Sequence, residues 1–404
     1  MRNLIGRAPL LVALGIVIGS LVAMTVPGAV AGQTQVPRTT DGEPDLNGIW
    51  QAIGTAHWDL EAHSARAGAL VPLGAVGAVT AGKSVDQGGE FPYQSWAVDK
   101  NKEYEIKKLS TENKELYGSV KPTEISKIIL ENDKREISKL RPLLEKNYCE
   151  QAAELIVSNP KTAIITTGFF ITGPDKPETD GPPGAIALGN SLESIGFQVK
   201  YVTDKVSSFV IENLTNSEVI EFPITNHNES KSFSKKIINT FQPSIIISIE
   251  RCGFTSTKRY KNMAGLDISE NNAKIDYLFE NDIPSVGIGD GGTEIGMGNL
   301  KTHIPKLMPK VQDPCVTQTS KLIISSVSNW GGYGLITALS LKSNKNLLPS
   351  VNDETNRINK SVELGAVDGF SKMNINKVDS FTIEENINKL KKLHQLLKTL
   401  KIPN

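Results

Sequence analysis

Cysteine is scarce in this chain of 404 residues, which contains only Cys149, Cys252 and Cys315. An odd number of widely spaced cysteines excludes a disulfide framework and a cysteine-based zinc site. It suits a protein that folds in a reducing compartment. Cys252 follows Glu250 and Arg251 and is a candidate nucleophile, although a small buried cysteine is the simpler interpretation.

Net charge is also absent, and aromatic residues are few. Lys and Arg together number 44, as do Asp and Glu, so the formal net charge is zero. Nucleic acids are bound by basic surfaces and by aromatic stacking platforms, so the composition predicts no nucleic-acid partner and favours a small molecule. The motifs H-E-x-x-H, G-x-S-x-G and GxxxxGK[ST] are missing, and the five histidines lie in polar, amphipathic or N-terminal settings. We therefore expect no histidine-driven catalytic triad.

Long apolar runs are missing after residue 31, so we predict no stable membrane span. The first 31 residues are typical of a secretory signal peptide. Arg2 and Arg7 precede an uncharged apolar run at 10–26, and an Ala-Val-Ala cleavage site follows at 29–31. That run is shorter than the ~20 residues that cross a bilayer comfortably, which leaves a membrane anchor as the alternative. Residues 1–31 therefore predict export to the periplasm or out of the cell.

Composition changes abruptly near residue 99. Residues 32–98 are rich in Ala, Gly and Val, and their opening PRTTDGEPDLNGIWQ resembles the start of secreted bacterial proteins of unknown function. From residue 99 onward Lys, Asn, Ile and Glu dominate, beginning with a charged run at 99–121 that predicts a solvated helix or linker. We infer that residues 1–98 have a separate origin, through a gene fusion or through the joining of unrelated reading frames.

Helix and strand signals alternate from residue 122 to the end. The expected strands are short and rich in β-branched residues, and lie at 162–166, 199–202, 218–224, 244–249, 283–289 and 322–327. The expected helices lie at 122–144, 185–195, 231–240, 269–279, 335–341 and 383–400. This alternation predicts an α/β domain at 122–404, with a doubly wound, mostly parallel sheet and helices on both faces, preceded by the signal-like and irregular N-terminal region.

The stretch IPSVGIGDGGTEIGMG at 283–298 is the most informative local feature. An apolar run ends in closely spaced glycines, which allow close approach of the backbone to a ligand, and these are interleaved with Asp290, Thr293 and Glu294. The position just past a buried strand is where open α/β sheets place their sites. Paired carboxylates there favour acid–base chemistry over phosphate binding. A tight turn with solvated acids is the alternative.

Polar residues follow other predicted strands too. Thr179, Asp180, Gly181 and Gly184 lead into a helix N-terminus, which suits a substrate carboxylate, although the acids there could simply cap the helix. Arg251 ends the fourth predicted strand, and its planar fork matches a carboxylate.

Further polar residues extend this set. Glu250 could be the ion-pair partner of Arg251, while Asn262 and Asp267 lead into the next predicted helix. Asn329, at the last strand end, carries an amide that could stabilise an oxyanion.

Taken in order, six motifs resemble the C-terminal domain of D-glutamate cyclases over about residues 122–400. They are TTGFF at 166–170, ETDGPPGAIALG at 178–189, Glu250-Arg251 with YKNMAGLDIS at 260–269, GIGDGGTEIGMG at 287–298, SNWGGYG at 328–334 and GAVDG at 365–369. The resemblance implies a lyase that converts D-glutamate to 5-oxo-D-proline and water, located in the cytoplasm or the mitochondrial matrix. Ala264 stands where the family usually has an arginine, and the segment 254–259 replaces a usual Asp-Gly pair.

Cyclisation requires a base, an acid and donors for an oxyanion. On this basis we expect Asp290, Glu294, Glu250 and Asn329 to be catalytic. The expected substrate-binding residues are Arg251, Thr179, Asp180, Gly181, Gly184, Asn262, Asp267, Gly291 and Gly292. Arg251 would hold the α-carboxylate, and the substrate would be D-glutamate or a similar amino acid.

Two other functions remain open from the residues. Asp180, Asp204, Glu250 and Asp290 could converge on a divalent cation such as Mg²⁺ and act on a phosphorylated metabolite, although the cyclisation itself predicts no cofactor. A binding protein without catalytic activity is the third possibility. The sequence leaves the oligomeric state open.

Overall fold

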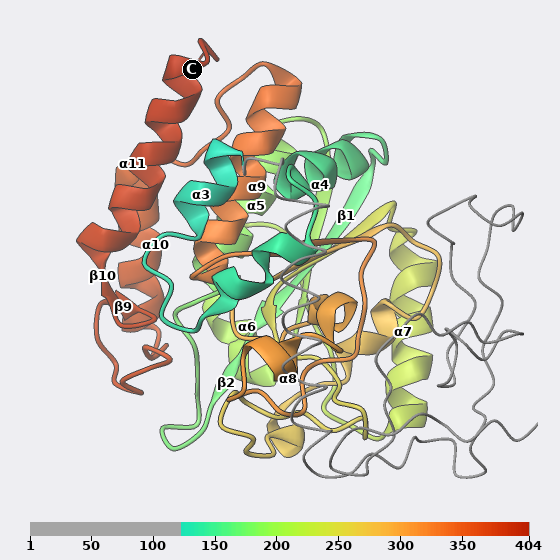
Figure 1. Cartoon of the computed structure of the whole chain (residues 1–404). Coiled ribbons are helices and arrows are strands. Elements are labelled where there is room, and N and C mark those ends of the chain that lie inside the picture. Colours follow the sequence, from blue (N-terminus) through green and yellow to red (C-terminus); the bar gives the residue numbers. More distant parts are fainter. Residues whose placement is uncertain (1–122, 404) are drawn as a thin grey trace, which may run out of the picture. The chain divides into compact units, whose positions relative to one another are not determined.

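The computed structural model describes residues 123–403, so the predicted signal peptide, N-terminal region and charged linker lie outside the described residues. Six strands form the main sheet: β1 (Thr162–Gly168), β4 (Gln198–Thr203), β5 (Val219–Glu221), β6 (Ile245–Arg251), β7 (Ser285–Gly289) and β8 (Lys321–Ile324). Their order is β5-β4-β1-β6-β7-β8, and every neighbouring pair is parallel. The predicted α/β fold with a parallel sheet is confirmed (Figure 1).

The chain reverses its direction of progress across the sheet at β1. From β1 it moves outward to β4 and β5, then returns to the other side of β1 and continues through β6, β7 and β8. Neighbouring crossovers therefore diverge at the carboxyl ends of β1 and β6, which leaves a crevice between them. Open α/β sheets place ligands at such a switch point.

Alternate residues of the central strands face opposite layers. In β1, Ala163 and Ile165 belong to the large apolar cluster on one face of the sheet, whereas Ile164 belongs to a smaller cluster on the other. This period of two is dictated by the pleat of a strand. Because both faces are covered, the central strands are apolar on both sides, as the β-branched runs of the sequence predict.

Most helices lie on the face of the larger cluster. They are α3 (Glu124–Ile129), α4 (Tyr148–Val157), α5 (Pro182–Glu193), α9 (Ser328–Ser343), α10 (Val351–Glu363) and α11 (Ile383–Thr399), and α9 contacts α3, α4, α5 and α11. On the other face, α7 (His227–Phe241) packs against a 3₁₀ turn at Ile275–Leu278 (Figure 1). Helix α6 (Lys205–Glu212) follows β4 and contacts β5.

Short elements complete the domain. They are the 3₁₀ turns η2 (Ile137–Leu143), η3 (Ser269–Asn271), η4 (Ile275–Leu278) and η5 (Met297–Leu300), the helix α8 (Ile304–Leu307), and the two-stranded pairs β2 (Phe170–Ile171) with β3 (Lys176–Pro177) and β9 (Lys377–Val378) with β10 (Phe381–Thr382). No helix among the described residues is long and apolar enough to cross a membrane.

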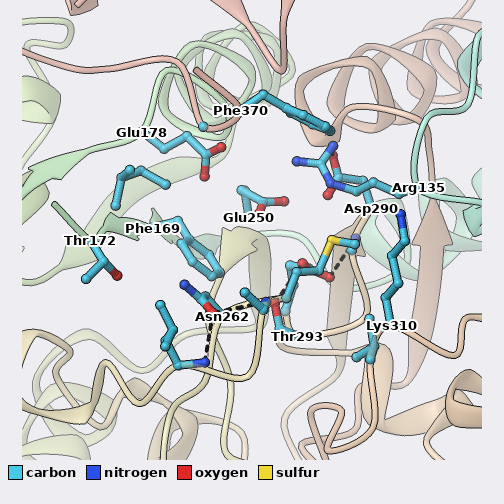
Figure 2. Close-up of a pocket in the computed structure, with 18 of the residues that line it drawn as sticks. Arg135, Phe169, Thr172, Glu178, Glu250, Asn262, Asp290, Thr293, Lys310 and Phe370 are labelled. Atoms are coloured by element: carbon cyan, nitrogen blue, oxygen red, sulfur yellow. Dashed lines mark hydrogen bonds and ion pairs between the residues drawn. The ribbon is translucent and has the colours of Figure 1, made fainter. Parts of the chain in front are cut away.

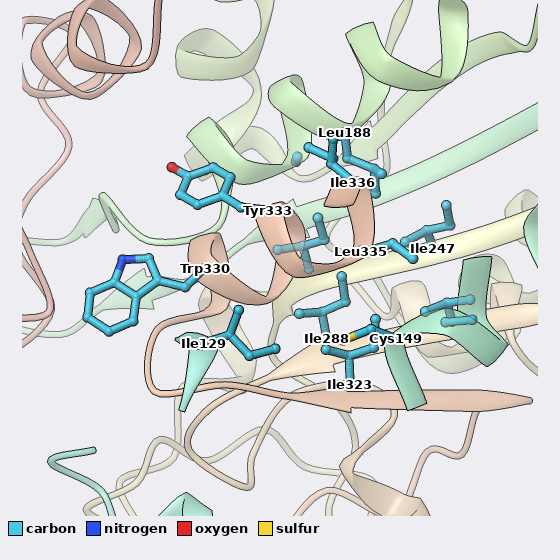
Figure 3. Close-up of a cluster of buried hydrophobic side chains, with 14 of the residues drawn as sticks. Ile129, Cys149, Leu188, Ile247, Ile288, Ile323, Trp330, Tyr333, Leu335 and Ile336 are labelled. Carbon is cyan, nitrogen blue, oxygen red and sulfur yellow. The ribbon is translucent and has the colours of Figure 1, made fainter. Parts of the chain in front are cut away.

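Helix α9 is buried almost all round and sits at the centre of the large core (Figure 3). Trp330 and Tyr333 are both 0% exposed, and the indole N–H of Trp330 donates to Asn386 Oδ1 of α11 at 2.8 Å. Burying one large apolar side chain contributes about 1.5–3 kcal/mol, and the hydrogen bond joins the C-terminal helix α11 to α9.

Most sequence-predicted elements are confirmed, and three are corrected. Residues 269–279 form two 3₁₀ turns instead of an α-helix, and residues 122–144 divide into α3 and a 3₁₀ turn at Ile137–Leu143. Thr123 is nevertheless the N-cap of α3, as predicted. The last strand ends at Ile324, and α9 begins at Ser328, so Asn329 and the glycines after it are helical.

Candidate functional site

A cavity of about 580 Å³ opens at the carboxyl ends of β1, β6 and β7 (Figure 2). Phe169 to Thr172 line it from the segment after β1, Glu250 lines it from the end of β6, and the loop after β7 contributes Asp290, Gly291, Thr293 and Glu294. Lys134 to Glu136, before the first strand, and Gly369, Phe370 and Lys372, near the C-terminus, complete the wall. The cavity therefore lies at the switch point of the sheet.

An arginine sits between two buried aspartates at one side of this cavity. Arg135 Nη1 and Nη2 donate to the two oxygens of Asp379 at 2.6 and 2.7 Å, and Nη1 also donates to Asp290 Oδ2 at 3.0 Å. The Phe370 ring lies 4.6 Å from the guanidinium carbon and covers its outer side. This bidentate pair fixes the guanidinium in a geometry that a lysine could not reproduce.

The glycine loop after β7 folds around the carboxylate of Glu294. Backbone N–H groups of Gly291 and Gly292 donate to Glu294 Oε2 at 3.2 and 2.8 Å, and Thr293 Oγ1 donates to Oε1 at 3.1 Å. Gly292 has a φ of +95°, which a residue with a side chain adopts only under strain. These three hydrogen bonds fix the position of the Glu294 carboxylate in the loop.

Glu250 lies at the carboxyl end of β6, in an unusual backbone conformation. Its φ is +43°, and its side chain is 3% exposed, with Oε2 accepting from Ser328 Oγ at 2.5 Å. Such left-handed residues outside glycine are often found at sites where the fold overrides local preference.

The buried carboxyls have pKa values displaced from their ordinary range. Burial raises the pKa of Glu250 well above its usual value, and the charges of Glu294 and Asp180 add to this. Burial also raises the pKa of Asp290, with Arg135 opposing the rise and Glu250 adding to it. Burial likewise pushes the pKa of Asp379 upward, but the charge and hydrogen bonds of Arg135 outweigh that effect and lower it. Neighbouring acids thus hold their protons differently, as acid–base sites require.

Five residues of the sequence-predicted site line the cavity: Glu250, Asn262, Asp290, Gly291 and Glu294. The neighbouring Thr293, which the sequence singled out in the glycine stretch, lines it too. Asn262 Oδ1 accepts from the backbone N–H groups of Ala264 and Leu266 at 3.1 and 3.0 Å, so its oxygen shapes the loop that carries Met263 and Ala264.

A second group lies behind the cavity wall. Asp180 is fully buried and accepts from the backbone N–H groups of Ser328 and Asn329 at 2.7 and 2.8 Å, so it caps the start of α9. Burial and the charge of Asp379 raise the pKa of Asp180 to about 7. Asn329 Oδ1 in turn accepts from the N–H groups of Gly181 and Gly184 at 3.0 and 2.8 Å. These contacts join the N-termini of α5 and α9. The N–H groups of Gly181 and Gly184, which we expected to bind a substrate carboxylate, therefore donate to Asn329 instead.

Thr179, Asp267 and Gly292 also lie off the cavity wall. Thr179 Oγ1 donates to Lys377 O at 2.8 Å, and exposed Asp267 pairs with Arg259 at the surface. Cys252, the alternative nucleophile, is fully buried, and burial raises its thiol pKa well above the ordinary value. It therefore lacks the thiolate character of a reactive cysteine.

Arg251 points away from the cavity. It is 0% exposed, its Nη1 lies 2.6 Å from Asp204 Oδ2, and its guanidinium donates to Gly168 O and Ala273 O at 3.1 and 2.9 Å. Asp204 is thus committed to this ion pair and does not join the other acids. The expected convergence of Asp180, Asp204, Glu250 and Asp290 is therefore corrected by the structure.

The acids that do converge form two overlapping groups. Asp180, Asp290 and Asp379 form one, and Glu250, Asp290 and Glu294 form the other; in each, one oxygen from every residue lies within 4.8 Å of the others. Among the described residues these are the groups whose ligand atoms could surround a metal ion.

Sequence reasoning missed several residues of the cavity. Arg135 and Lys310 lie in charged surface-like stretches, where nothing distinguishes them from solvated side chains. Glu178, which lines the cavity, was outside the expected site although it stands in the ETDG motif. Asp379, which holds Arg135, was also not expected, and it lies shortly after GAVDG. Those motifs were the available signal.

Comparison with known proteins gives two kinds of similarity. A family model described as D-glutamate cyclase-like, C-terminal, matches residues 125–394. The human protein D-glutamate cyclase, mitochondrial, is 31% identical over 208 residues, which cover 46% of this chain and 34% of that protein. Large ribosomal subunit protein bL9 of Pelagibacter ubique is 79% identical over 47 residues, or 11% of this chain and 31% of that protein. The chain thus spans about a third of the length of each of these relatives.

Proposed function

We propose that this chain, which belongs to the family of D-glutamate cyclase-like C-terminal domains, is a lyase that cyclises D-glutamate to 5-oxo-D-proline with loss of water. The observation that carries the proposal is the group of buried carboxyls around Arg135 in the switch-point cavity. The human relative bears the name of this activity and supports the same reaction class.

The reaction closes a five-membered ring within one molecule. The α-nitrogen forms a bond to the γ-carboxyl carbon, a carbon–oxygen bond breaks, and both protons that the nitrogen loses leave with the oxygen as water. The protein must therefore move protons from nitrogen to oxygen without a net gain or loss. Holding the substrate in the folded conformation supplies much of the remaining rate enhancement.

Glu250 and Asp290 are the pair we assign to this proton transfer. Both line the cavity, both are buried, and the pKa of each is raised by burial and by the other acids. Two close carboxyls that cannot both ionise share a proton, so one can accept from the amine while the other donates to the departing oxygen. Glu294 lies beside this pair, and three hydrogen bonds hold its carboxylate in place.

The substrate carboxylates need cations in the cavity. Lys310 is exposed at the rim, on the Asp290 side (Figure 2), and Arg135 lies deeper in the same wall. Ala264 also lines the cavity, where the resemblance leads us to expect an arginine, so we assign the carboxylate contact to Lys310.

Turnover of the two enantiomers of glutamate tests the function. The purified full chain is incubated with D- or L-glutamate, and 5-oxoproline is quantified by chiral chromatography and mass spectrometry. We expect product from D-glutamate, and a kcat reduced about 10²–10⁴-fold in Asp290→Asn, since proton transfer contributes this much. Absence of product from both enantiomers contradicts the function, and full turnover by Asp290→Asn contradicts the acid–base assignment.

Binding of the carboxylates is tested separately at the rim. Lys310→Ala should raise KM by about tenfold with a smaller effect on kcat, because it removes a contact made in the ground state as well as in the transition state. Lys306→Ala, an exposed lysine of α8 that does not line the cavity, is the matched control.

The cellular compartment of the catalytic domain is also a proposal. All three cysteines are buried and free of disulfides, and the name of the human relative includes a mitochondrial location. Both support an internal, reducing compartment, in conflict with the predicted signal peptide at 1–31. Fractionation of source cells with an antibody to the domain distinguishes the two.

A further inference from the structure

Asp290 has a carboxylate oxygen with no partner. The side chain is 1% exposed, and Oδ2 receives the hydrogen bond from Arg135, but Oδ1 accepts from no donor among the described residues. A buried oxygen without a donor costs about 1–3 kcal/mol, more when charged. A ligand that supplies positive charge at Oδ1 would remove this cost.

The two acidic groups that share Asp290 differ in how they are neutralised. In the Asp180, Asp290 and Asp379 group, Arg135 already donates to two of the three carboxylates, and Asp180 is satisfied by backbone N–H groups of α9. In the Glu250, Asp290 and Glu294 group, no cationic side chain donates to Glu250 or Glu294 within the described part of the chain. The second group therefore has two carboxylates, those of Glu250 and Glu294, without a cationic hydrogen-bond partner among the described residues, and only Asp290 is paired with Arg135.

We propose that Glu250, Asp290 and Glu294 bind one hard divalent cation, such as Mg²⁺, Mn²⁺ or Ca²⁺, in the cavity. Their oxygens lie within 4.8 Å of one another. Oxygens bound to one Ca²⁺ at about 2.3–2.6 Å lie up to about 5 Å apart, and those bound to Mg²⁺ up to about 4.2 Å, so a small rotation of one side chain suffices.

The ligand chemistry selects the class of metal. The group contains carboxylates alone, which favour Mg²⁺, Ca²⁺ and Mn²⁺ over the softer metals that prefer thiolate or imidazole. The adjoining cavity of about 580 Å³ leaves room for the water ligands that Mg²⁺ retains. The site therefore suits a cation that keeps open positions toward a bound substrate.

Mn²⁺ alone is the probe for this site. Electron paramagnetic resonance of free Mn²⁺, titrated with the full chain after treatment with EDTA and dialysis, should show one site per chain with a dissociation constant below 1 mM. Asp290→Asn and Glu250→Gln should each weaken binding at least tenfold. Glu136→Gln, an exposed acid at the rim of the cavity, should bind as the wild type does. Added Mg²⁺ or Ca²⁺ should displace the bound Mn²⁺.

Three results would overturn the proposal. They are the absence of binding by the wild type below 1 mM, binding by Asp290→Asn or Glu250→Gln as tight as wild type, and an equal loss in Glu136→Gln. If neither cluster variant folds, the melting temperature of the wild type decides, since a bound cation must raise it. No substrate is present in these experiments, so they stand or fall independently of the cyclisation.

Discussion

Half-buried Arg135 and fully buried Arg251 both face carboxylates, yet only Arg135 lines the cavity. Arg251 is enclosed by Asp204 and two backbone carbonyls, so all its strong contacts are internal. Arg135 is held by Asp379 and Asp290 and keeps one side against Phe370 and the cavity. From the sequence Arg251 looked like the better ligand, because it ends a strand, whereas Arg135 stands in a charged stretch.

Replacing Asp204 tests the structural role of Arg251. Asp204→Asn leaves a fully buried guanidinium without its counter-charge, and breaking a buried ion pair in this way costs about 3–5 kcal/mol. Unfolding in urea measures the change. Asp267→Asn, which breaks the exposed pair with Arg259, is the control and should cost at most about 1 kcal/mol. A cost for Asp204→Asn as small as that of the control would contradict this role.

The residue types of the sequence therefore indicated which acids line the cavity better than they indicated which groups those side chains contact. Asp290 and Glu294 were found because glycines and acids follow an apolar run, a pattern local in sequence. The partners of Asp290 are 155 residues away at Arg135, a distance over which sequence patterns carry no information. Asn329 was expected in a loop, but it lies in the first turn of α9, where its side chain binds backbone.

At the scale of elements, the contact between α5 and α9 sets the shape of the wall behind the cavity. The backbone N–H of Asn329 donates to Asp180 Oδ1, Asn329 Oδ1 accepts from the backbone N–H of Gly184, and Gly184 lies directly against Asn329. This contact requires that no side chain intervene. In the sequence this contact is indicated only by two separate motifs, the Gly/Pro motif at 178–189 and the glycine motif at 328–334.

Gly184→Ala should disrupt this contact. An added Cβ would lie 2.7 Å from Asn329 Oδ1 and 2.8 Å from Asn329 Cα, so the helices must separate. We expect a loss of about 1–3 kcal/mol in unfolding free energy and reduced turnover, measured by urea unfolding and product formation.

The matched control lies on the facing helix. In Gly332→Ala the added Cβ would meet Gly184 O at 3.4 Å, an ordinary contact, and alanine favours a helix interior by about 1 kcal/mol over glycine. Gly332→Ala should therefore be neutral or stabilising. Equal destabilisation by both variants would show that helix separation is not the cause.

The elements themselves were largely predictable, with informative exceptions. Strands β1, β4, β6 and β7 were recognised because buried parallel strands are continuous apolar runs. Residues 269–279 were expected to form a helix, but they close over Arg251 and Asp204 through the backbone of Ala273. Contacts to buried groups elsewhere overrode the local helical preference there.

At the scale of the whole molecule, the buried acids tie stability to pH. A carboxyl whose pKa is higher in the folded chain than in the unfolded chain binds more protons when folded, so stability falls as pH rises between the two values. For Asp180 this window runs from 3.8 to about 7, and Glu250 and Asp290 shift in the same direction. The pKa of Asp379 is lowered in the folded chain, so this residue makes stability rise with pH, but only at acidic pH below its ordinary pKa.

Glu250→Gln should therefore flatten the decline in stability between pH 5 and pH 7. Each proton difference corresponds to about 1.4 kcal/mol per pH unit. Urea unfolding of the wild type and the variant, in EDTA at several pH values, measures the two slopes. His227 and His303, whose pKa values burial lowers, oppose the trend equally in both proteins. Identical slopes would refute the linkage.

The inference that residues 1–98 have a separate origin stays a prediction, because they lie outside the described residues. The chain has relatives with two unrelated names, a D-glutamate cyclase and a ribosomal protein. Reading one DNA molecule from the source across the junction near residue 99 tests it. An interrupted reading frame would remove the conflict over localisation.

The ion pair between Arg135 and Asp379 joins positions 244 residues apart. Arg135 precedes every strand of the main sheet in the sequence, and Asp379 follows them all. A ribosome therefore releases Arg135, every strand of the main sheet and all the other cavity acids before it releases Asp379. During synthesis the growing chain must hold that arginine next to Asp290 alone, with the second anchor still to come. Chains that stop before residue 379 would carry every strand of the main sheet and yet lack one carboxylate partner of Arg135, so activity would report whether translation passed residue 379.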